Sequence, residues 1–174
     1  MTLSGLRSGH PGISEAFGAA LAEAAVVCLE SQGHRTGKRI SATGTFQRAF
    51  ILAWEILQEE AQRSWADSEV ATEFGAYGVA ALVVKALTGQ VVLERSRKGT
   101  GFDFWLGPPT AQTPLFQGKS RLEISGIRKG TERQIQARVA SKLRQTERSD
   151  ATLTLRAIVA VVEFGAPRTE VRVR

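Results

Sequence analysis

Apolar residues at helical spacing recur in four places along the chain, and each recurrence predicts a helix. The predicted helices span residues 14–30, 46–62, 70–87 and 131–148. The third is apolar nearly all round, which is typical of a helix buried against a sheet. The fourth has a narrow apolar stripe beside a polar one and is the most basic helix in the chain, so the two differ in their expected surroundings.

Runs rich in β-branched and apolar residues predict strands. The predicted strands are residues 90–95, 102–106, 121–127 and 152–164. The last of these is continuously apolar, as expected of a central strand that is covered on both faces. Residues 169–174 alternate valine with arginine or glutamate, which predicts an edge strand or a tail.

The beginning of the chain differs from the rest. Residues 1–13 lack periodicity and predict a loose N-terminus. Residues 31–45 are polar, basic and interrupted by glycine, which predicts a loop or a short strand around residues 39–42. We therefore expect an N-terminal helical extension, residues 1–66, packed on an α/β core formed by residues 67–174.

Charge and composition narrow the class of protein. The net charge of +6 favours a polyanionic partner such as nucleic acid. A single cysteine, Cys28, excludes an internal disulfide and a multi-cysteine zinc site. We find no apolar run of bilayer-spanning length and no signal peptide at the start, so we expect a cytoplasmic protein without a membrane partner.

Two acidic residues lie inside strands that are otherwise apolar. Asp103 is flanked by phenylalanines, and Glu123 by leucine and isoleucine. A buried carboxylate must be paired, hydrogen-bonded or bound to a metal. Neighbouring strands lie about 5 Å apart, so these two carboxylates could share one cation. Glu73 shares a helical line with Tyr77 and Val84, which leaves two interpretations open: an inward-pointing acid, or a structural residue near the helix N-terminus.

From about residue 67 the expected order is helix, strand, strand, strand, helix, strand, with the two acids on the second and third strands. This order resembles the PD-(D/E)XK nuclease-like superfamily over about residues 67–165. The resemblance implies an αβββαβ restriction-endonuclease-like core. It also implies that Asp103 and Glu123 hold Mg²⁺ or Mn²⁺, and that Glu73 is the acid which the first helix sometimes adds.

The chain departs from the family at the E-x-K motif. Its third-strand sequence is Glu123-Ile-Ser125, with serine where the family has lysine. Members of the family can carry the lysine on the neighbouring helix instead, and Lys142 is the candidate, with Lys119 and Lys129 as weaker ones. The candidate catalytic residues are therefore Asp103, Glu123, Ser125 and Lys142, and the candidate phosphate contacts are Lys98, Lys119, Arg138 and Arg144.

Three hypotheses follow. The first is a magnesium-dependent nuclease that hydrolyses phosphodiester bonds, with DNA as the expected substrate. The second is an inactive nuclease-fold scaffold or nucleic-acid-binding subunit of a larger complex. It is favoured by Ser125 and by N-terminal helices that could bind a protein partner or another copy of the chain. The third is an unrelated α/β binding domain in which the two acids pair with Arg121 or Lys119. No glycine-rich phosphate loop follows a strand, and no Ser-His-Asp arrangement is indicated.

Overall fold

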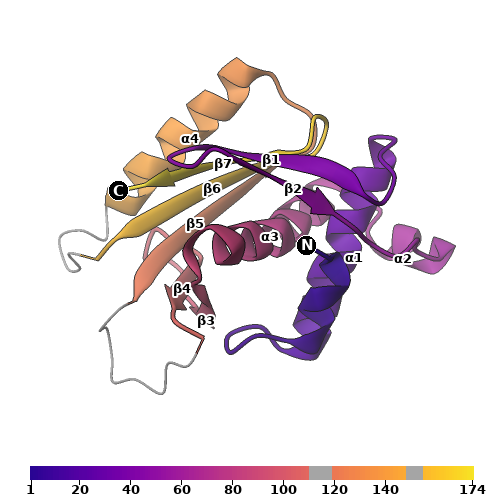
Figure 1. Ribbon diagram of the computed structural model, residues 1–174, viewed down its shortest axis with the longest axis horizontal. Coiled ribbons are helices and arrows are strands. Elements are labelled where there is room, and N and C mark those ends of the chain that lie inside the picture. The colour runs from indigo at the N-terminus through magenta and orange to yellow at the C-terminus, as the bar shows by residue number, and fades with distance from the viewer. Residues whose placement is uncertain (110–118, 148–154) are drawn as a thin grey trace.

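The computed structural model describes residues 1–109, 119–147 and 155–174. The strands in chain order are β1 (Lys38–Gly44), β2 (Arg48–Leu52), β3 (Val91–Arg95), β4 (Phe104–Gly107), β5 (Ser120–Ile127), β6 (Ala157–Glu163) and β7 (Arg168–Val173). The helices are the 3-10 helix η1 (Leu3–Ser8) and the α-helices α1 (Glu15–Ser31), α2 (Glu59–Ser64), α3 (Ser68–Thr88) and α4 (Glu132–Glu147). The described strands form one sheet in the order β2-β1-β7-β6-β5-β4-β3 (Figure 1).

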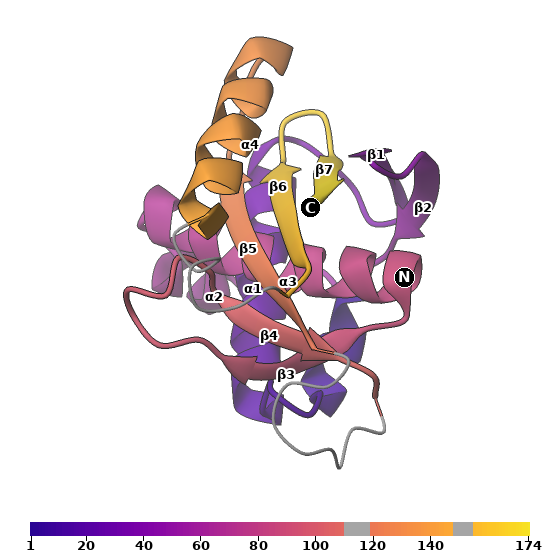
Figure 2. The ribbon, with the colours of Figure 1, turned by 90° about the vertical axis from the view of Figure 1, so that its left-hand side faces the viewer.

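Helices cover both faces of the sheet. Helix α3 packs on one face with α1 beside it, and α4 lies on the other face (Figure 2). The larger apolar core lies on the α3 side and includes Phe104, Leu122 and Ile124. A smaller core joins Ile135 and Val139 of α4 to valines of β6. The protein therefore has a mixed α/β fold, as the sequence predicts.

The segment from α3 to β6 has the predicted order of elements. Strand β3 is antiparallel to β4, β4 is antiparallel to β5, and β5 is parallel to β6. The second predicted strand begins at Phe104, two residues later than expected. Arg148, at the predicted end of the fourth helix, and residues 152–154, at the predicted start of the last strand, lie outside the described residues.

Helix ends follow the expected capping chemistry. The Ser14 hydroxyl accepts a hydrogen bond from the Phe17 amide at the start of α1. At the start of α3 the Asp67 carboxylate accepts from the next two free amides, those of Glu69 and Val70. Helix α3 ends at Gly89, whose φ of 74° suits glycine. These caps fix the register of the two helices that form the α3 side of the fold.

The predicted helix over residues 46–62 is wrong. Residues 48–52 form strand β2, which pairs with β1 in an antiparallel hairpin, and only Glu59–Ser64 is helical. Phe50 and Trp54 fit a helical spacing of four, but together with Leu52 they also alternate with a period of two. Pairing with β1 selects the strand. Residues 38–52 thus extend the sheet, and the boundary at residue 66 stays a prediction.

Two further expectations about the ends of the chain are corrected. The N-terminus is not loose, because Leu3, Leu6 and Ile13 are buried and the Leu3 amide donates to the Ala53 carbonyl. Strand β7 is not an edge strand or a tail, because it pairs with β6 on one side and with β1 on the other. The β1–β2 hairpin supplies the edge that the sequence assigned to β7.

Helix α3 is long and apolar enough to cross a membrane by length and composition, with a mean hydropathy of 1.4 in its most apolar window. This corrects the expectation that no such run exists. In the structure, 61% of that window is buried inside the protein, where α3 packs on the sheet and on α1. A buried core helix explains this composition.

Candidate functional site

The structure brings the two strand acids side by side. In the β4–β5 ladder Phe104 is opposite Leu122, so Asp103, one residue before β4, comes opposite Glu123. The Asp103 amide donates to the Leu122 carbonyl at 2.9 Å, which continues the ladder by one bond. Strand β4 begins at Phe104, so beyond Asp103 it no longer pairs with β5. The two acids therefore lie side by side where this pairing ends.

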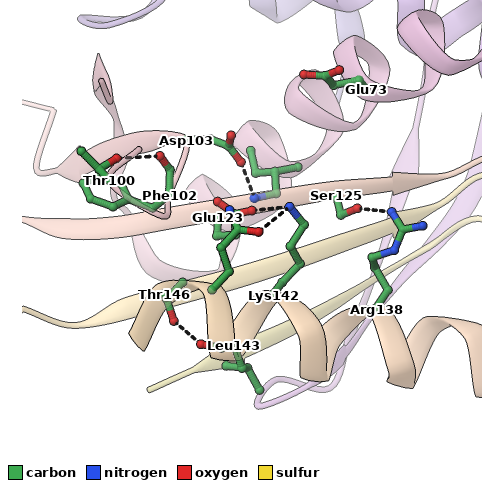
Figure 3. A network of polar contacts seen from close by, with 12 residues as sticks. Glu73, Thr100, Phe102, Asp103, Glu123, Ser125, Arg138, Lys142, Leu143 and Thr146 are labelled. Atoms are coloured by element: carbon green, nitrogen blue, oxygen red, sulfur yellow. Dashed lines mark hydrogen bonds and ion pairs between the residues drawn. The ribbon is translucent and has the colours of Figure 1, made fainter. Parts of the chain in front are cut away.

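This break in the sheet forms the floor of a pocket of about 660 Å³. Glu123 and Ser125 of β5 line it together with Asp103. Helix α3 contributes Glu69, Glu73 and Tyr77 to one wall, and helix α4 contributes Arg138, Lys142 and Gln145 to the opposite wall. Figure 3 shows Glu73 on α3, above strand β5. Lys142 and Arg138 extend toward β5 from α4, below it.

Lys142 pairs directly with Glu123. Its Nζ lies 2.5 Å from Glu123 Oε1 and also donates to Gln145 Oε1 at 3.2 Å. Only 1% of the Glu123 side chain is exposed, against 22% of the Lys142 side chain. Because Ile135 and Val139 pack against β6, the polar stripe of α4 faces this part of β5. A buried ion pair thus links α4 to the strand that carries the acid.

The two carboxyl groups disturb each other's protonation. Burial, and then the charge of Asp103, raise the pKa of Glu123 to about 7, although Lys142 opposes the rise. Burial also raises the pKa of Asp103, against the hydrogen bond that the Ile124 amide donates to its Oδ2 at 2.7 Å and against the charge of Lys142. Glu123 Oε2 accepts no hydrogen bond from the described residues unless it shares a proton with Asp103. Binding of a proton or a cation would therefore reduce the repulsion between the two carboxylates.

The raised pKa of Glu123 predicts the pH dependence of stability. The folded state holds a proton up to about pH 7, whereas the unfolded state loses it near 4.5, so folding binds a proton between these values. The free energy of unfolding should therefore fall as pH rises from 4.5 to 7, by roughly 3 kcal/mol, and then level off. Urea unfolding in EDTA across this range measures the slope. In Glu123→Gln the slope should become shallower, because only the raised pKa of Asp103 then contributes to it, and an unchanged slope would contradict the assignment.

Tyr77 is the site residue that the sequence interpretation missed. Its hydroxyl donates to Glu73 Oε1 at 2.7 Å and lies 3.4 Å from Asp103 Oδ1. Burial raises the pKa of Tyr77 above its ordinary value, so the phenol stays protonated and can donate. The signal available in the sequence was the helical line shared by Glu73 and Tyr77, but this spacing does not indicate that the phenol hydroxyl contacts the acid.

The other candidate residues divide into two groups. Arg138 Nη1 donates to Ser125 Oγ at 2.8 Å, so these two lie in the pocket as a pair. Lys98, Lys119 and Arg144 are not among the pocket's lining residues. Lys98 is exposed in the turn after β3. Arg144 is exposed on a different side of α4 from Arg138, because a step of six residues turns a helix by about 240°.

Arg121, which the third hypothesis pairs with the acids, donates to backbone carbonyls. Its Nη1 reaches the carbonyl of Thr146 at 3.1 Å, and its Nη2 reaches that of Leu155 at 2.5 Å. These contacts tie the start of β5 to the end of α4 and to the residue before β6. Arg121 therefore has a structural role, and Lys142 pairs with Glu123.

The two strand acids are the candidate metal ligands. Across residues 1–109, 119–147 and 155–174, no group of three or more His, Cys, Asp and Glu side chains is arranged to hold a metal. Glu73 is hydrogen-bonded to Tyr77. Asp103 and Glu123 nevertheless fit Mg²⁺ or Mn²⁺, because their adjacent carboxylate oxygens are the hard ligands that these ions prefer. One of these oxygens, Glu123 Oε2, accepts no hydrogen bond from the described residues. Such ions commonly bind proteins through one or two carboxylates, with water and phosphate completing the shell.

Comparison with known proteins adds no relative to this geometry. The chain matched no model of a protein family, no curated protein and no solved structure.

Proposed function

We propose that this protein is a metal-dependent nuclease, or a nuclease-like nucleic-acid-processing subunit, that hydrolyses phosphodiester bonds, with DNA as the expected substrate. The observation that carries the proposal is the pair of carboxylates, Asp103 and Glu123, with Lys142 Nζ 2.5 Å from Glu123 Oε1. The order of elements from α3 to β6 supports assigning this segment to a restriction-endonuclease-like core. The net charge of +6 is consistent with a polyanionic substrate.

Each residue has a role that its contacts support. Asp103 and Glu123 would hold Mg²⁺ or Mn²⁺, and the bound ion would polarise the phosphodiester and lower the pKa of water. Lys142 brings a positive charge into the pocket from the α4 wall, where it can stabilise negative charge that develops on the phosphate. Tyr77 donates to Glu73 and limits where this third acid can turn.

The proposal is tested by cleavage of single- and double-stranded DNA and of RNA with Mg²⁺ or Mn²⁺. Asp103→Asn and Glu123→Gln should each lower kcat/KM at least a hundredfold, or about 2.7 kcal/mol, because each removes an anionic donor for the ion. Glu94→Gln, an exposed position on β3 outside the pocket, is the matched control and should retain activity. Cleavage that persists equally in all three variants would rule out this site.

Metal binding can be measured without catalysis. A divalent ion that binds only the folded state, at a concentration about a hundred times its Kd, should stabilise the protein by about 2.7 kcal/mol. Thermal unfolding should show this as a higher Tm with Mn²⁺ for the wild type and for Glu94→Gln. Glu123→Gln should lose most of the shift. Equal shifts in all three proteins would indicate that the ion binds elsewhere.

One observation favours an inactive scaffold or nucleic-acid-binding subunit instead. Lys142 already neutralises Glu123, and Ser125, at the position where the resembled family has lysine, is bonded to Arg138. A site whose charges satisfy one another in this way can persist without a metal. This function would be supported if no metal promotes cleavage while DNA binding persists and weakens as salt rises.

A further inference from the structure

The two walls of the pocket carry charges of opposite sign. The α3 wall presents Glu69 and Glu73, whereas the α4 wall presents Arg138 and Lys142. A phosphate chain that enters this pocket is repelled by the first wall and attracted by the second. The path of a bound strand is therefore restricted to the α4 side.

Arg138 is held in place on that side. Its guanidinium donates to Ser125 Oγ, a buried hydroxyl on the strand that also carries Glu123. Arg138 precedes Lys142 by four residues, so the two side chains lie on one line of the helix about 6 Å apart along its axis. Two cations at this separation can contact two successive phosphates of one strand, which a single sugar separates.

The hollow continues past Arg138. A second depression of about 330 Å³ is lined by Ile127, Gln134, Ala137, Arg138 and Ser141. Arg138 is shared by both depressions, whereas Lys142 lines only the first. The α4 wall therefore offers room for a chain on both sides of Arg138.

We propose that the substrate is a polynucleotide whose cleaved strand runs along α4, with the reacting phosphate beside Lys142 and the next phosphate on Arg138. Ser125 acts as a positioning residue that holds the guanidinium toward the strand. This inference rests on the proposed function and adds to it the direction of the strand relative to the fold. A dinucleotide, which has one phosphodiester, cannot reach both cations.

The first experiment needs neither metal nor cleavage. Fluorescence anisotropy of a labelled single-stranded oligonucleotide in EDTA measures affinity as a function of salt. Arg138→Gln should weaken binding about tenfold at low salt and reduce the magnitude of the salt slope by about 0.7, the value for one lost contact to a single strand. Arg138→Lys should keep the slope, and Arg133→Gln, an exposed α4 position that lines neither depression, should match the wild type.

The second experiment compares cleavage of the oligonucleotide with cleavage of a dinucleotide. Arg138→Gln should lower the ratio of their kcat/KM values about tenfold, and Ser125→Ala should lower it less while leaving the salt slope intact. If Arg138→Gln behaves like Arg133→Gln in binding, the inference is overturned, even where cleavage still depends on Asp103. Absence of cleavage would count against the proposed function alone, because the binding experiment still decides the role of Arg138.

Discussion

Lys142→Met should destabilise the protein by about 3 kcal/mol, because it leaves the buried carboxylate of Glu123 without its partner. Lys142 also opposes the rise in the pKa of Glu123, so this pKa should move still higher in the variant. The variant should consequently be most destabilised at alkaline pH, where Glu123 must ionise, and least destabilised in acid. Urea unfolding in EDTA at several pH values measures both effects.

A double-mutant cycle separates the lost pair from lost packing. Lys142→Met combined with Glu123→Gln removes the buried charge together with its partner, so most of the lost stability should return. Lys85→Met, an exposed position near the end of α3, is the matched control and should change stability by less than about 0.5 kcal/mol. If the double variant is as unstable as the sum of the single variants, the two side chains are not coupled in the folded protein.

The site could be anticipated from the sequence because its chemistry stands out locally. A carboxylate between apolar strand residues, at Asp103 and again at Glu123, contradicts the ordinary burial pattern of a strand. Lys142 lies on the polar stripe of α4, and it became a candidate through the resemblance to a superfamily whose members can carry the lysine on this helix. Tyr77 was not predicted as a site residue, because its ring packs as a core residue against Phe104 and only its hydroxyl contacts the acids. Periodicity cannot distinguish these two ends of one side chain.

The fold from α3 to β6 was predictable because each helix and strand there has a local pattern typical of one kind of element, either a helical period, as in α4, or an apolar run rich in β-branched residues, as in β6. Residues 46–62 do not, since the same aromatic residues fit spacings of four and of two. The outcome depends on pairing between β2 and β1 and of β1 with β7, which lies more than a hundred residues away. Alternating valine and charge in β7 looked like an edge strand, although Thr169 and Glu170 are buried by their neighbours. Such long-range pairing leaves no local signal.

Gly126→Val should lower the free energy of unfolding by about 3 kcal/mol, because β5 and α3 touch at this glycine. A Cβ at Gly126 would lie 2.4 Å from the carbonyl oxygen of Thr72, a backbone atom that cannot move unless the helix moves. Glu73 follows Thr72 directly, so any helix displacement that relieves the clash would also shift the third acid away from Asp103. We therefore expect lower stability in urea unfolding, together with reduced metal-dependent cleavage in the fraction that folds. Gly5→Ala is the control, since its nearest neighbour, Thr2 Oγ1, would lie at 3.6 Å. Wild-type stability in Gly126→Val would show that α3 and β5 do not pack as closely as described.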